Sequence, residues 1–332
     1  MTRSYDKHVL VTGAAGFIGC NFLGYFANKY SNYHFTCIDK LNYASASSQE
    51  AFQKILQKPN VDFLKLDLAE SYHQLYQLIA LNYEANQITD IVNFAAESSV
   101  DRSFEDPLYF TRNNILSTQN LLECYRLLKN LHPEAHINFL HISTDEVYGD
   151  SGYNVDEQGK LSPTNPYAAS KAAIDLIIQS YEYSYKLPIM VIRPNNIYGP
   201  NQFPEKIVPV AIEHLKSNSK IPIHGDGSNK RRYLHVRDFL NALELIWSFS
   251  ETADAGDIFN VGSDEEVSNI HLVSLLCQLY HKDSTFDLQE KIQFTQDRNY
   301  NDLSYSTSAD KIRSLGWKPK VKLQDGLKDL LG

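Results

Sequence analysis

Short apolar runs alternate with segments whose apolar residues recur at helical spacing along the first half of the chain. The runs are almost continuously apolar, as in strands of a parallel sheet that is covered on both faces. We expect strands at residues 8–12, 35–39, 61–66, 90–95, 137–143 and 189–192, and a later strand at 258–261 that rejoins the sheet. We expect helices at residues 17–29, 71–82, 114–129 and 166–185. This alternation predicts an α/β fold with a doubly wound parallel sheet.

The pattern changes after residue 194, where prolines and glycines interrupt it. They are Pro194, Pro200, Pro204, Pro209 and Pro222, with Gly199, Gly225 and Gly227. We therefore predict two units: a sheet domain of residues 1–196 plus about 235–262, and a smaller, discontinuous C-terminal lobe of about 197–234 and 263–332.

Composition narrows the class of protein without naming a function. The 332 residues are 43% apolar and 21% charged, which is typical of globular proteins. A net charge of −9 argues against a general nucleic-acid binder, because that affinity depends on cations that neutralise phosphates. No apolar stretch reaches the length of a membrane span, and the polar N-terminus leads straight into a strand-like run. We expect no nucleic acid, no membrane and no signal peptide.

The four cysteines are scattered along the chain, without a C-x-x-C motif or histidines at metal-ligand spacing. They are Cys20, Cys37, Cys124 and Cys277. We expect small buried thiols, no metal site and a reducing, cytoplasmic location.

A glycine-rich turn follows the first expected strand. Its glycines, Gly13, Gly16 and Gly19, suit a tight turn, the approach of a pyrophosphate and close packing of helix on strand. The helix that follows offers free N–H groups to phosphates. Asp39 ends the second strand, twenty residues past Gly19, where an acid binds ribose hydroxyls and repels a 2′-phosphate. The turn predicts NAD binding; the alternative is a chance turn with a solvated acid. Asp67 ends the third strand in the same way.

Tyr167 and Lys171 lie four residues apart on a predicted helix, so both point the same way. Such a pair is common on amphipathic helices, but after a dinucleotide-binding half it predicts proton transfer. The ammonium and a nicotinamide charge are expected to lower the pKa of the phenol. Asp145 and Glu146 follow the fifth strand, where the ligand crevice of a parallel sheet lies. Ser143 or Thr144, just before them, can hydrogen-bond a substrate hydroxyl, and Thr144 is counted with the acid pair as catalytic. Two carboxyls in different surroundings can serve as acid and base; the alternative is a solvated polar loop.

With these motifs the chain resembles the extended short-chain dehydrogenase/reductase family, and within it the nucleoside-diphosphate-glucose 4,6-dehydratases. The matching segments are TGAAGFIG (12–19), FAAESSVDRS (94–103), STDEVYG (143–149), NPYAASK (165–171), YGP (198–200), FPEK (203–206) and LGWKP (315–319). The resemblance covers nearly the whole chain and implies a Rossmann domain with bound NAD and a sugar-nucleotide lobe. It also implies a homodimer.

The resemblance further implies a hydro-lyase reaction. Tyr167, assisted by Lys171, takes the proton of the sugar 4-hydroxyl while NAD⁺ accepts the C4 hydride. Glu146 then removes the C5 proton, and Asp145 protonates the departing C6 hydroxyl. Return of the hydride to C6 leaves a 4-keto-6-deoxy sugar on dTDP or UDP.

Further residues match binding positions of the family. Those on the cofactor side are Gly13, Gly16, Phe17, Ile18, Gly19, Asp39, Lys40, Leu41, Asn42, Asp67, Leu68, Phe94, Ala95, Ala96, Glu97, Asn113, Tyr167, Lys171 and Ile197. Those on the side of the substrate are Ser98, Thr144, Asn196, Lys206, Ile207, Pro222, Ile223, His224, Arg231, Asn269, Asp297, Arg298 and Asn301. The alternative for Lys206 and Arg231, taken singly, is an exposed cation.

Departures from the family pattern leave the nucleotide preference open. They are Ser99 for a usual histidine, Asn113 for threonine, Ile197 for asparagine, Asn299 for proline and Ser304 for arginine. The pair at 301 and 302, Asn-Asp, favours the UDP type. Two other functions remain open. One is a UDP-sugar 4-epimerase or decarboxylase that shares Tyr167 and Lys171, and the other is a non-catalytic NAD-binding scaffold.

Overall fold

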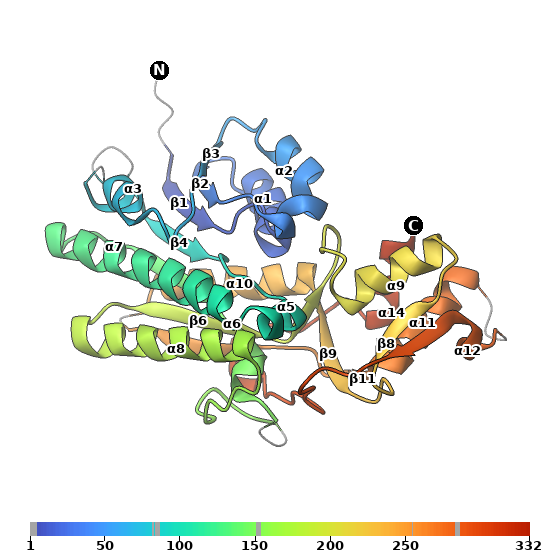
Figure 1. Ribbon diagram of the computed structural model, residues 1–332. Helices are drawn as coiled ribbons and strands as arrows, with labels where there is room; N and C mark the ends of the chain where they lie inside the picture. The colour runs from blue at the N-terminus through green and yellow to red at the C-terminus, as the bar shows by residue number, and fades with distance from the viewer. Residues whose placement is uncertain (1–4, 82, 84–86, 151–153, 254, 283–285) are drawn as a thin grey trace.

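Seven parallel strands form the central sheet of the computed structural model, which describes residues 5–81, 83, 87–150, 154–253, 255–282 and 286–332 (Figure 1). Their order across the sheet is β10-β6-β5-β4-β1-β2-β3. The strands are β1 (Lys7–Thr12), β2 (Tyr33–Asp39), β3 (Val61–Lys65), β4 (Asp90–Asn93), β5 (Asn138–Ile142), β6 (Ile189–Pro194) and β10 (Asp257–Val261). The doubly wound prediction is confirmed, and β10 rejoins the sheet beside β6. The order of the strands reverses at β1, so a ligand crevice is expected at its carboxyl end.

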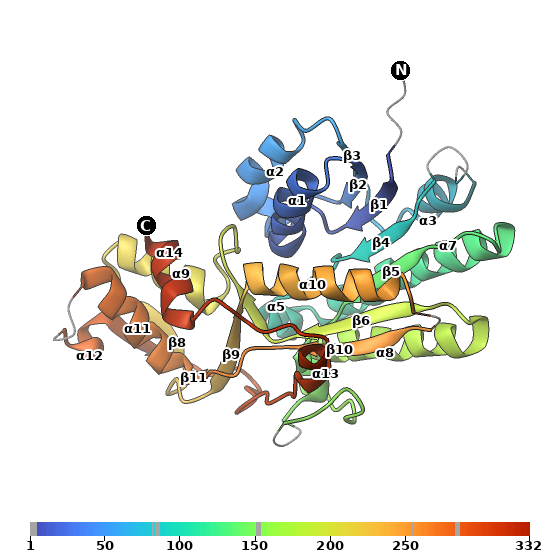
Figure 2. The same ribbon diagram turned by 180° about the vertical axis from the view of Figure 1, so that it is seen from behind.

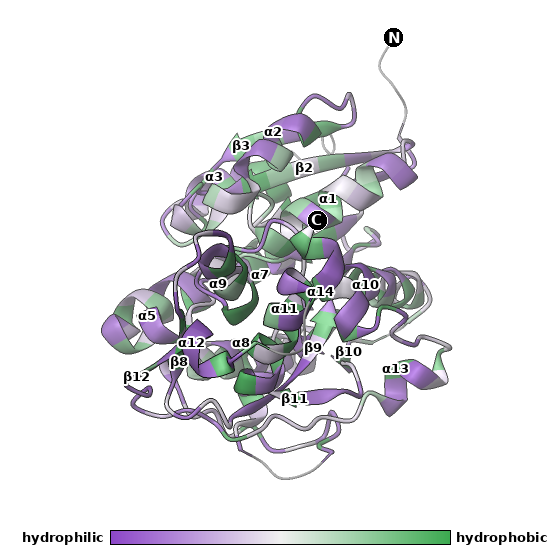
Figure 3. Cartoon of the chain, turned by 90° about the vertical axis from the view of Figure 1, so that its right-hand side faces the viewer, coloured by the Kyte–Doolittle hydropathy of each residue, from purple (hydrophilic) through white to green (hydrophobic). Residues whose placement is uncertain are grey.

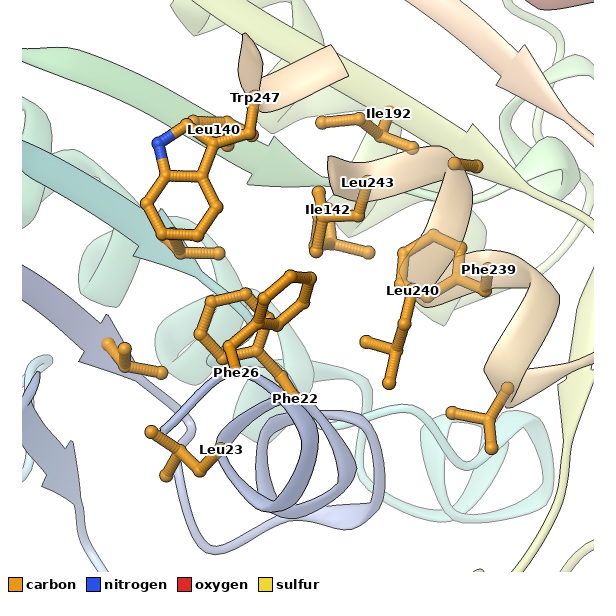
Figure 4. Packing of buried hydrophobic residues seen from close by; sticks show 14 of the residues in the cluster. Phe22, Leu23, Phe26, Leu140, Ile142, Ile192, Phe239, Leu240, Leu243 and Trp247 are labelled. Atoms are coloured by element: carbon orange, nitrogen blue, oxygen red, sulfur yellow. The ribbon is translucent and has the colours of Figure 1, made fainter. Parts of the chain in front are cut away.

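Helices cover both faces of this sheet. On one face lie α1 (Phe17–Lys29), α2 (Gln49–Ile55) and α10 (Val236–Ser250). Phe22 and Phe26 of α1 meet Trp247 of α10 at ring-centroid distances of 6.0 and 5.8 Å, and Figure 4 shows them packed with strand residues such as Leu140 and Ile142. On the other face lie α3 (Tyr72–Tyr76), a wide turn of π-helix (Gln77–Leu81), α7 (Ser117–Leu131) and α8 (Pro166–Tyr185). Figure 2 views the molecule from behind and shows α1 and α10 on the first of these two faces.

Two predicted helices differ from the structure in their boundaries. The helix expected at 114–129 begins with a wide turn, Thr111–Leu116, before α7. Asn114 in this turn holds the backbone of Glu97, accepting from its N–H at 2.7 Å and donating to its carbonyl at 3.0 Å. The helix expected at 71–82 is α3 with the wide turn after it; residue 82 lies outside the described residues. Two short helices, α5 (Val100–Glu105) and α6 (Pro107–Phe110), precede the wide turn at Thr111–Leu116.

The smaller lobe has its own sheets and core (Figure 1). Its strands are β7 (Asn196–Tyr198), β8 (Ile221–His224), β9 (Lys230–His235), β11 (Glu266–Ser268) and β12 (Ile292–Thr295). Its helices are α9 (Ile207–Lys216), α11 (Asn269–His281), α12 (Leu288–Lys291) and α14 (Leu323–Leu331). In Figure 3, α9, α11 and α14 each carry both apolar and polar residues. Their apolar side chains, including Leu272, Leu276 and Leu327, form the core of the lobe.

One segment of the C-terminal part packs against the larger domain. Helix α13 (Asp310–Ser314) and Trp317 belong to the core beneath α10, and the Trp317 indole donates to the Asp238 carbonyl at 3.1 Å. The backbone N–H groups of Lys320 and Val321 both donate to the Asp238 carboxylate at 2.8 Å. The chain therefore crosses the larger domain before it returns to the lobe as α14. The residue limits of the two domains stay a prediction.

All four cysteines are buried and unpaired. In the described part of the chain, no helix has the length and apolar character that a membrane crossing requires. The same residues contain no group of three or more histidine, cysteine or acidic side chains that could hold a metal ion.

Candidate active site

The glycine-rich turn brings β1, α1 and β4 into close contact. Gly13 has a φ of +65°, and a Cβ there would lie 2.6 Å from the backbone nitrogen of Ala95. A Cβ on Gly19 would lie 2.3 Å from the carbonyl oxygen of Gly13. Both contacts are with backbone atoms, which cannot rotate away. Only glycine fits at these two positions, as the turn motif predicts.

Asp39 closes this turn from the end of β2. Its carboxylate accepts hydrogen bonds from the N–H groups of Ala15, at 3.0 Å, and Leu41, at 2.8 Å. Each carboxylate oxygen keeps a further lone pair for ribose hydroxyls. Helix α1 begins after Gly16 without a capping side chain, so its first N–H groups remain free for phosphates. These residues fit a dinucleotide.

An open cavity lies over this turn. Of the residues predicted for the cofactor, it is lined by Gly13, Gly16, Phe17, Ile18, Gly19, Asp39, Lys40, Asn42, Asp67, Leu68, Phe94, Ala95, Ala96, Glu97, Asn113, Tyr167 and Lys171. Leu41 does not line it, and Ile197 lines a second cavity instead. Ile197 lies on β7, beyond the end of β6, so the chain has already passed to the smaller lobe.

The second cavity lies between the larger domain and the lobe. Of the residues predicted for substrate, it is lined by Ser98, Thr144, Asn196, Lys206, Ile207, Pro222, Ile223, His224, Arg231, Asn269, Arg298 and Asn301. Asp297 does not line it; its carboxylate instead accepts from the Asn301 side chain at 2.9 Å. Asp297 therefore contacts a residue of the cavity wall, Asn301, and does not face the cavity itself.

The two cavities share one wall. The shared residues are Phe17, Ile18, Ser98, Ile142, Ser143, Tyr167, Gln202, Glu205 and Lys206. A ligand held along the glycine turn and a ligand held by the lobe therefore meet beside Tyr167. A hydride or proton transfer between two bound molecules requires this arrangement.

Tyr167 and Lys171 lie one turn apart near the start of α8. The Asn165 side chain caps this helix, accepting from the N–H of Ala168 at 2.8 Å. Lys171 donates to the carbonyl of Ile142 at 2.7 Å, and burial lowers the pKa of its ammonium to about 8. The lowering of the Tyr167 pKa that is expected with a bound nicotinamide stays a prediction, and in the protein alone this pKa is raised. Burial, and then the nearby carboxylates, raise it because both disfavour a phenolate.

The acid pair lies on a short 3₁₀ turn, Asp145–Tyr148, just after β5. Thr144 caps the turn, its hydroxyl accepting from the N–H of Glu146 at 3.3 Å. Asp145 is 2% exposed, and its carboxyl accepts from the Asn195 amide at 2.8 Å. Burial, and then the negative charge of Glu146, raise the pKa of Asp145 to about 7. Asp145 therefore holds a proton in a large fraction of molecules near neutral pH.

Glu146 has different surroundings from its neighbour. It is only half-buried, and its carboxylate accepts from the Asn165 amide at 3.3 Å and from the Tyr305 hydroxyl at 3.5 Å. Both carboxyls line the second cavity together with Tyr167. One group buried and protonated beside another that is more exposed matches an acid and a base working on one ligand.

Cationic side chains approach the second cavity from several elements. Lys206 donates to the carbonyl of Ser98 at 2.7 Å, and burial lowers the pKa of its ammonium. Arg231 donates to the carbonyl of Asp302 at 2.9 Å and to the Asn301 side chain at 3.2 Å. These two side chains are therefore positioned in the cavity wall, contrary to the alternative of freely exposed cations.

The sequence motifs did not reveal every residue of the site. Asn195 follows β6 and holds Asp145, while Tyr305 reaches Glu146 from a loop far along the chain. Asp302 in that loop accepts from both the Thr164 hydroxyl, at 2.7 Å, and Tyr305. The position of Asn195 just past the end of a strand could have indicated that it belongs to the site, because such positions face the ligand crevice. Nothing in the local sequence marks Tyr305.

The comparisons with known proteins agree with this geometry. The GDP-mannose 4,6 dehydratase family matches residues 10–330. A dTDP-D-glucose 4,6-dehydratase of Mus musculus is 36% identical over 98% of this chain and 88% of its own length. A trifunctional UDP-glucose 4,6-dehydratase/UDP-4-keto-6-deoxy-D-glucose 3,5-epimerase/UDP-4-keto-L-rhamnose-reductase of Arabidopsis thaliana is 38% identical over 98% of this chain and 47% of its own length.

A solved structure shows the same architecture. It is a dTDP-glucose 4,6-dehydratase of Streptomyces venezuelae with NAD and TYD bound, 33% identical, with a TM-score of 0.85 over 97% of this chain and 95% of that one. The family match over nearly the whole chain, the shared fold and the arrangement of the two cavities lead to one conclusion. The chain belongs to the GDP-mannose 4,6 dehydratase family.

Proposed function

We propose that the protein is an NAD-dependent 4,6-dehydratase of a nucleoside-diphosphate-glucose, with dTDP- or UDP-glucose as substrate and the 4-keto-6-deoxy sugar nucleotide as product. One observation carries this proposal. Asp145 and Glu146, in contrasting surroundings, line the same cavity as Tyr167, and that cavity adjoins the glycine-turn cavity. The names of the relatives point to the same reaction.

The residues of the first cavity fit NAD. The free N–H groups after Gly16 suit its pyrophosphate, and the Asp39 carboxylate suits ribose hydroxyls and disfavours a 2′-phosphate. When bound there, NAD would supply a hydride acceptor for C4 of the sugar and, in its reduced form, a hydride donor for C6. The wall shared by the two cavities includes Tyr167, which supports hydride transfer beside this residue.

Three side chains of this chain then move protons at three positions of the sugar. Tyr167 takes the proton of the 4-hydroxyl, with Lys171 as its neighbouring amine. Glu146 removes the proton from C5, which a ketone at C4 makes acidic, and returns it to C5 when the hydride reaches C6. Asp145, protonated because burial raises its pKa to about 7, donates to the hydroxyl that leaves C6.

The second cavity suits a diphosphate in spite of the acidic chain. Residues 220–238 carry five basic and two acidic side chains, and Arg231 lines the cavity with Lys206. An Arg fork and a Lys point charge are the common partners of phosphate oxygens. The nucleotide stays open between dTDP and UDP, since relatives named for either are similar to this chain; the Asn301-Asp302 pair favours UDP.

A 4-epimerase or decarboxylase is the second candidate, and the acid pair weighs against it. Oxidation at C4 and return of the hydride to the same carbon require Tyr167 and Lys171 but no separate acid and base. The scaffold alternative requires neither pair. Here both pairs line the cavities, and Asp145 is held by Asn195.

Incubation with dTDP-glucose and with UDP-glucose tests the proposal. Dehydration yields a keto sugar that absorbs strongly in alkali, whereas epimerisation yields a galacto-sugar and no keto product. Retention of NAD without turnover of either nucleotide would favour the scaffold.

Glu146→Gln provides the matched test of mechanism. We expect C4 oxidation to persist and reduced-nicotinamide absorbance to accumulate in a single turnover, while the keto-deoxy product falls by at least about a hundredfold. Glu266→Gln is the control, because Glu266 contacts Ser304 and lines neither cavity. Full product formation by Glu146→Gln would contradict the assigned base.

We further propose a homodimer formed through the outer face of α7 and α8, which lie side by side in Figure 1. Large apolar side chains are exposed on this face. Leu131 ends α7 at 52% exposure, and Leu176 and Tyr183 of α8 are 55% and 80% exposed. Light scattering on the purified chain tests this, and a monomer at micromolar concentration would contradict it.

The unpaired thiols support a cytoplasmic location, which imaging of a tagged chain would test.

A further inference from the structure

A buried chain of polar side chains runs beneath the site and connects Lys171 to the interior of the sheet. Lys171 Nζ lies 3.4 Å from His141 Nε2, and His141 Nδ1 lies 3.0 Å from the Asn93 amide nitrogen. That nitrogen also donates to the Thr118 hydroxyl at 3.2 Å. None of these four side chains is more than 2% exposed. They come from β4, β5, α7 and α8, so only the tertiary structure brings them together.

The orientation of the Asn93 amide follows from its other partners. Its oxygen accepts from the Thr12 hydroxyl at 2.6 Å and from the backbone N–H of Ala95 at 3.3 Å. A backbone N–H is only a donor, so the amide oxygen must face Ala95. The amide nitrogen therefore faces His141 and Thr118.

The orientation of Asn93 determines the tautomer of His141. An amide nitrogen is only a donor, so His141 Nδ1 must accept its hydrogen bond and carries no proton. The ring is fully buried, and burial together with the charge of Lys171 lowers the pKa of His141 well below its usual range. A neutral imidazole has one N–H, which therefore stands on Nε2 and points to Lys171.

This N–H acts on the charge of Lys171. An ammonium group is only a donor, so an N–H directed at it is repulsive, whereas a neutral amine accepts that hydrogen bond with its lone pair. The other groups around the amine are few. Ile142 accepts from it at 2.7 Å, Asp175 on the next turn favours the charged form, and Tyr167 lies one turn before it. The charge of Asp175 is itself paired with Arg193 at 2.8 Å.

We propose that His141 is a positioning residue that directs its Nε2–H at Lys171 and thereby keeps this side chain poised between amine and ammonium. The burial of Lys171 acts in the same direction, since it lowers the pKa of the ammonium to about 8. The inference bears on catalysis only through the proposed function, in which Lys171 assists Tyr167. The arrangement in the resting protein does not depend on that function.

The first test needs no variant. Ring ¹⁵N shifts of histidine-labelled protein, purified with whatever cofactor it retains, report which nitrogen carries the proton. We expect one histidine with Nε2 protonated and Nδ1 bare that does not titrate between about pH 6 and 9; His141→Phe assigns it by loss of its signals. A proton on Nδ1, or a charged ring in this range, would overturn the proposal.

The second test follows Lys171 itself, through the Cε signal of ¹³C-labelled lysine assigned with Lys171→Met. In His141→Phe the opposing N–H is gone, while the Asn93 amide keeps Thr118 as a partner. We expect the Lys171 midpoint to rise by about one pH unit. Thr118→Val is the matched control: it removes a hydrogen bond from the same chain without changing the tautomer, and it should leave the midpoint in place. An unchanged or lowered midpoint in His141→Phe would refute the inference.

Activity gives a third readout that separates this inference from the proposed function. If dehydration is observed, His141→Phe should move the alkaline limb of kcat/KM, on which Lys171 loses the charge that assists Tyr167, to higher pH by the same amount. A shift to lower pH would contradict the inference. If neither nucleotide is dehydrated, the proposed function fails, while the two spectroscopic tests still decide the role of His141. Should His141→Phe fail to fold, His141→Leu replaces it, because this variant also removes the N–H without adding a charge.

Discussion

Asp145→Asn replaces a buried carboxyl by an amide of the same shape, and it should stabilise the protein at alkaline pH. Asp145 is 2% exposed and lies beside Glu146, so that its ionisation in the folded protein is unfavourable. The amide oxygen of the variant can still accept the hydrogen bond from Asn195, which the wild-type carboxyl accepts at 2.8 Å. The substitution therefore removes the ionisation and retains the contact.

The magnitude follows from the two pKa values of this group. Burial raises the pKa from 3.8 to about 7 in the folded protein, so the folded state binds the proton more tightly than the unfolded state. The stability from that proton is fully present below the unfolded pKa and is lost as pH rises to about 7. A shift of about three units corresponds to about 4 kcal/mol in total, of which about 2 to 3 kcal/mol falls between pH 5 and pH 8.

Urea unfolding at pH 5 and pH 8 measures this difference. The free energy of unfolding of Asp145→Asn, relative to wild type, should be greater at pH 8 by about 2 to 3 kcal/mol. Glu146→Gln gives an internal check: it removes the negative charge beside Asp145, lowers the pKa of that carboxyl and should reduce the pH dependence. Equal pH dependence of wild type and Asp145→Asn would refute the reasoning. Dehydration should fail in Asp145→Asn, because an amide is a far weaker acid than a carboxyl.

Two further predictions concern the glycine turn and the core. Gly19→Ala puts a Cβ 2.3 Å from the Gly13 carbonyl, so the turn must shift and NAD affinity, measured by calorimetry, should fall by at least about tenfold. Gly24→Ala on the same helix is the control, since its Cβ would lie 3.8 Å from Ile55. This variant should raise the free energy of unfolding by about 0.5 to 1 kcal/mol. Equal NAD affinity in the two variants would contradict the close packing at Gly19. Trp247→Phe removes the indole N–H that the buried Asp90 carboxylate accepts at 2.6 Å, and urea unfolding should show a loss of about 2 kcal/mol. A change below about 0.5 kcal/mol would mean that Asn138, Thr89 and Lys7 suffice for Asp90.

The strands of the large sheet could be expected from apolar runs alone, because parallel strands buried on both faces leave a continuous apolar signal; their order across the sheet came from the tertiary structure. The helix at 114–129 was placed less well. Asn113 and Asn114 interrupt its apolar spacing, and their side chains bind Tyr109 and Glu97 within the wide turn before α7. Those contacts depend on the site that the turn borders, which periodicity cannot reveal.

Most predicted residues that line a cavity lie where a motif joins a strand end to a helix start. Such positions face the crevice in any doubly wound sheet, as with Asp39 and Asp145. Leu41, Asp297 and Ile197 were assigned by their place in a matching motif, and their position depends on loop geometry and on the path into the lobe. Tyr305 was missed because its partner Glu146 lies far away in the sequence.

The sequence by itself determined the class of fold, the glycine turn and the types of reacting group, because each follows from local spacing: apolar runs, three glycines, and a tyrosine and lysine one helical turn apart. Only the tertiary structure decided the protonation states of these groups. The different pKa values of neighbouring acids, the proton on His141 Nε2 and the charge balance of Lys171 depend on burial and on partners from distant strands. Desolvation and hydrogen bonding act through space, so residues far apart in the chain set the acidity of those at the site.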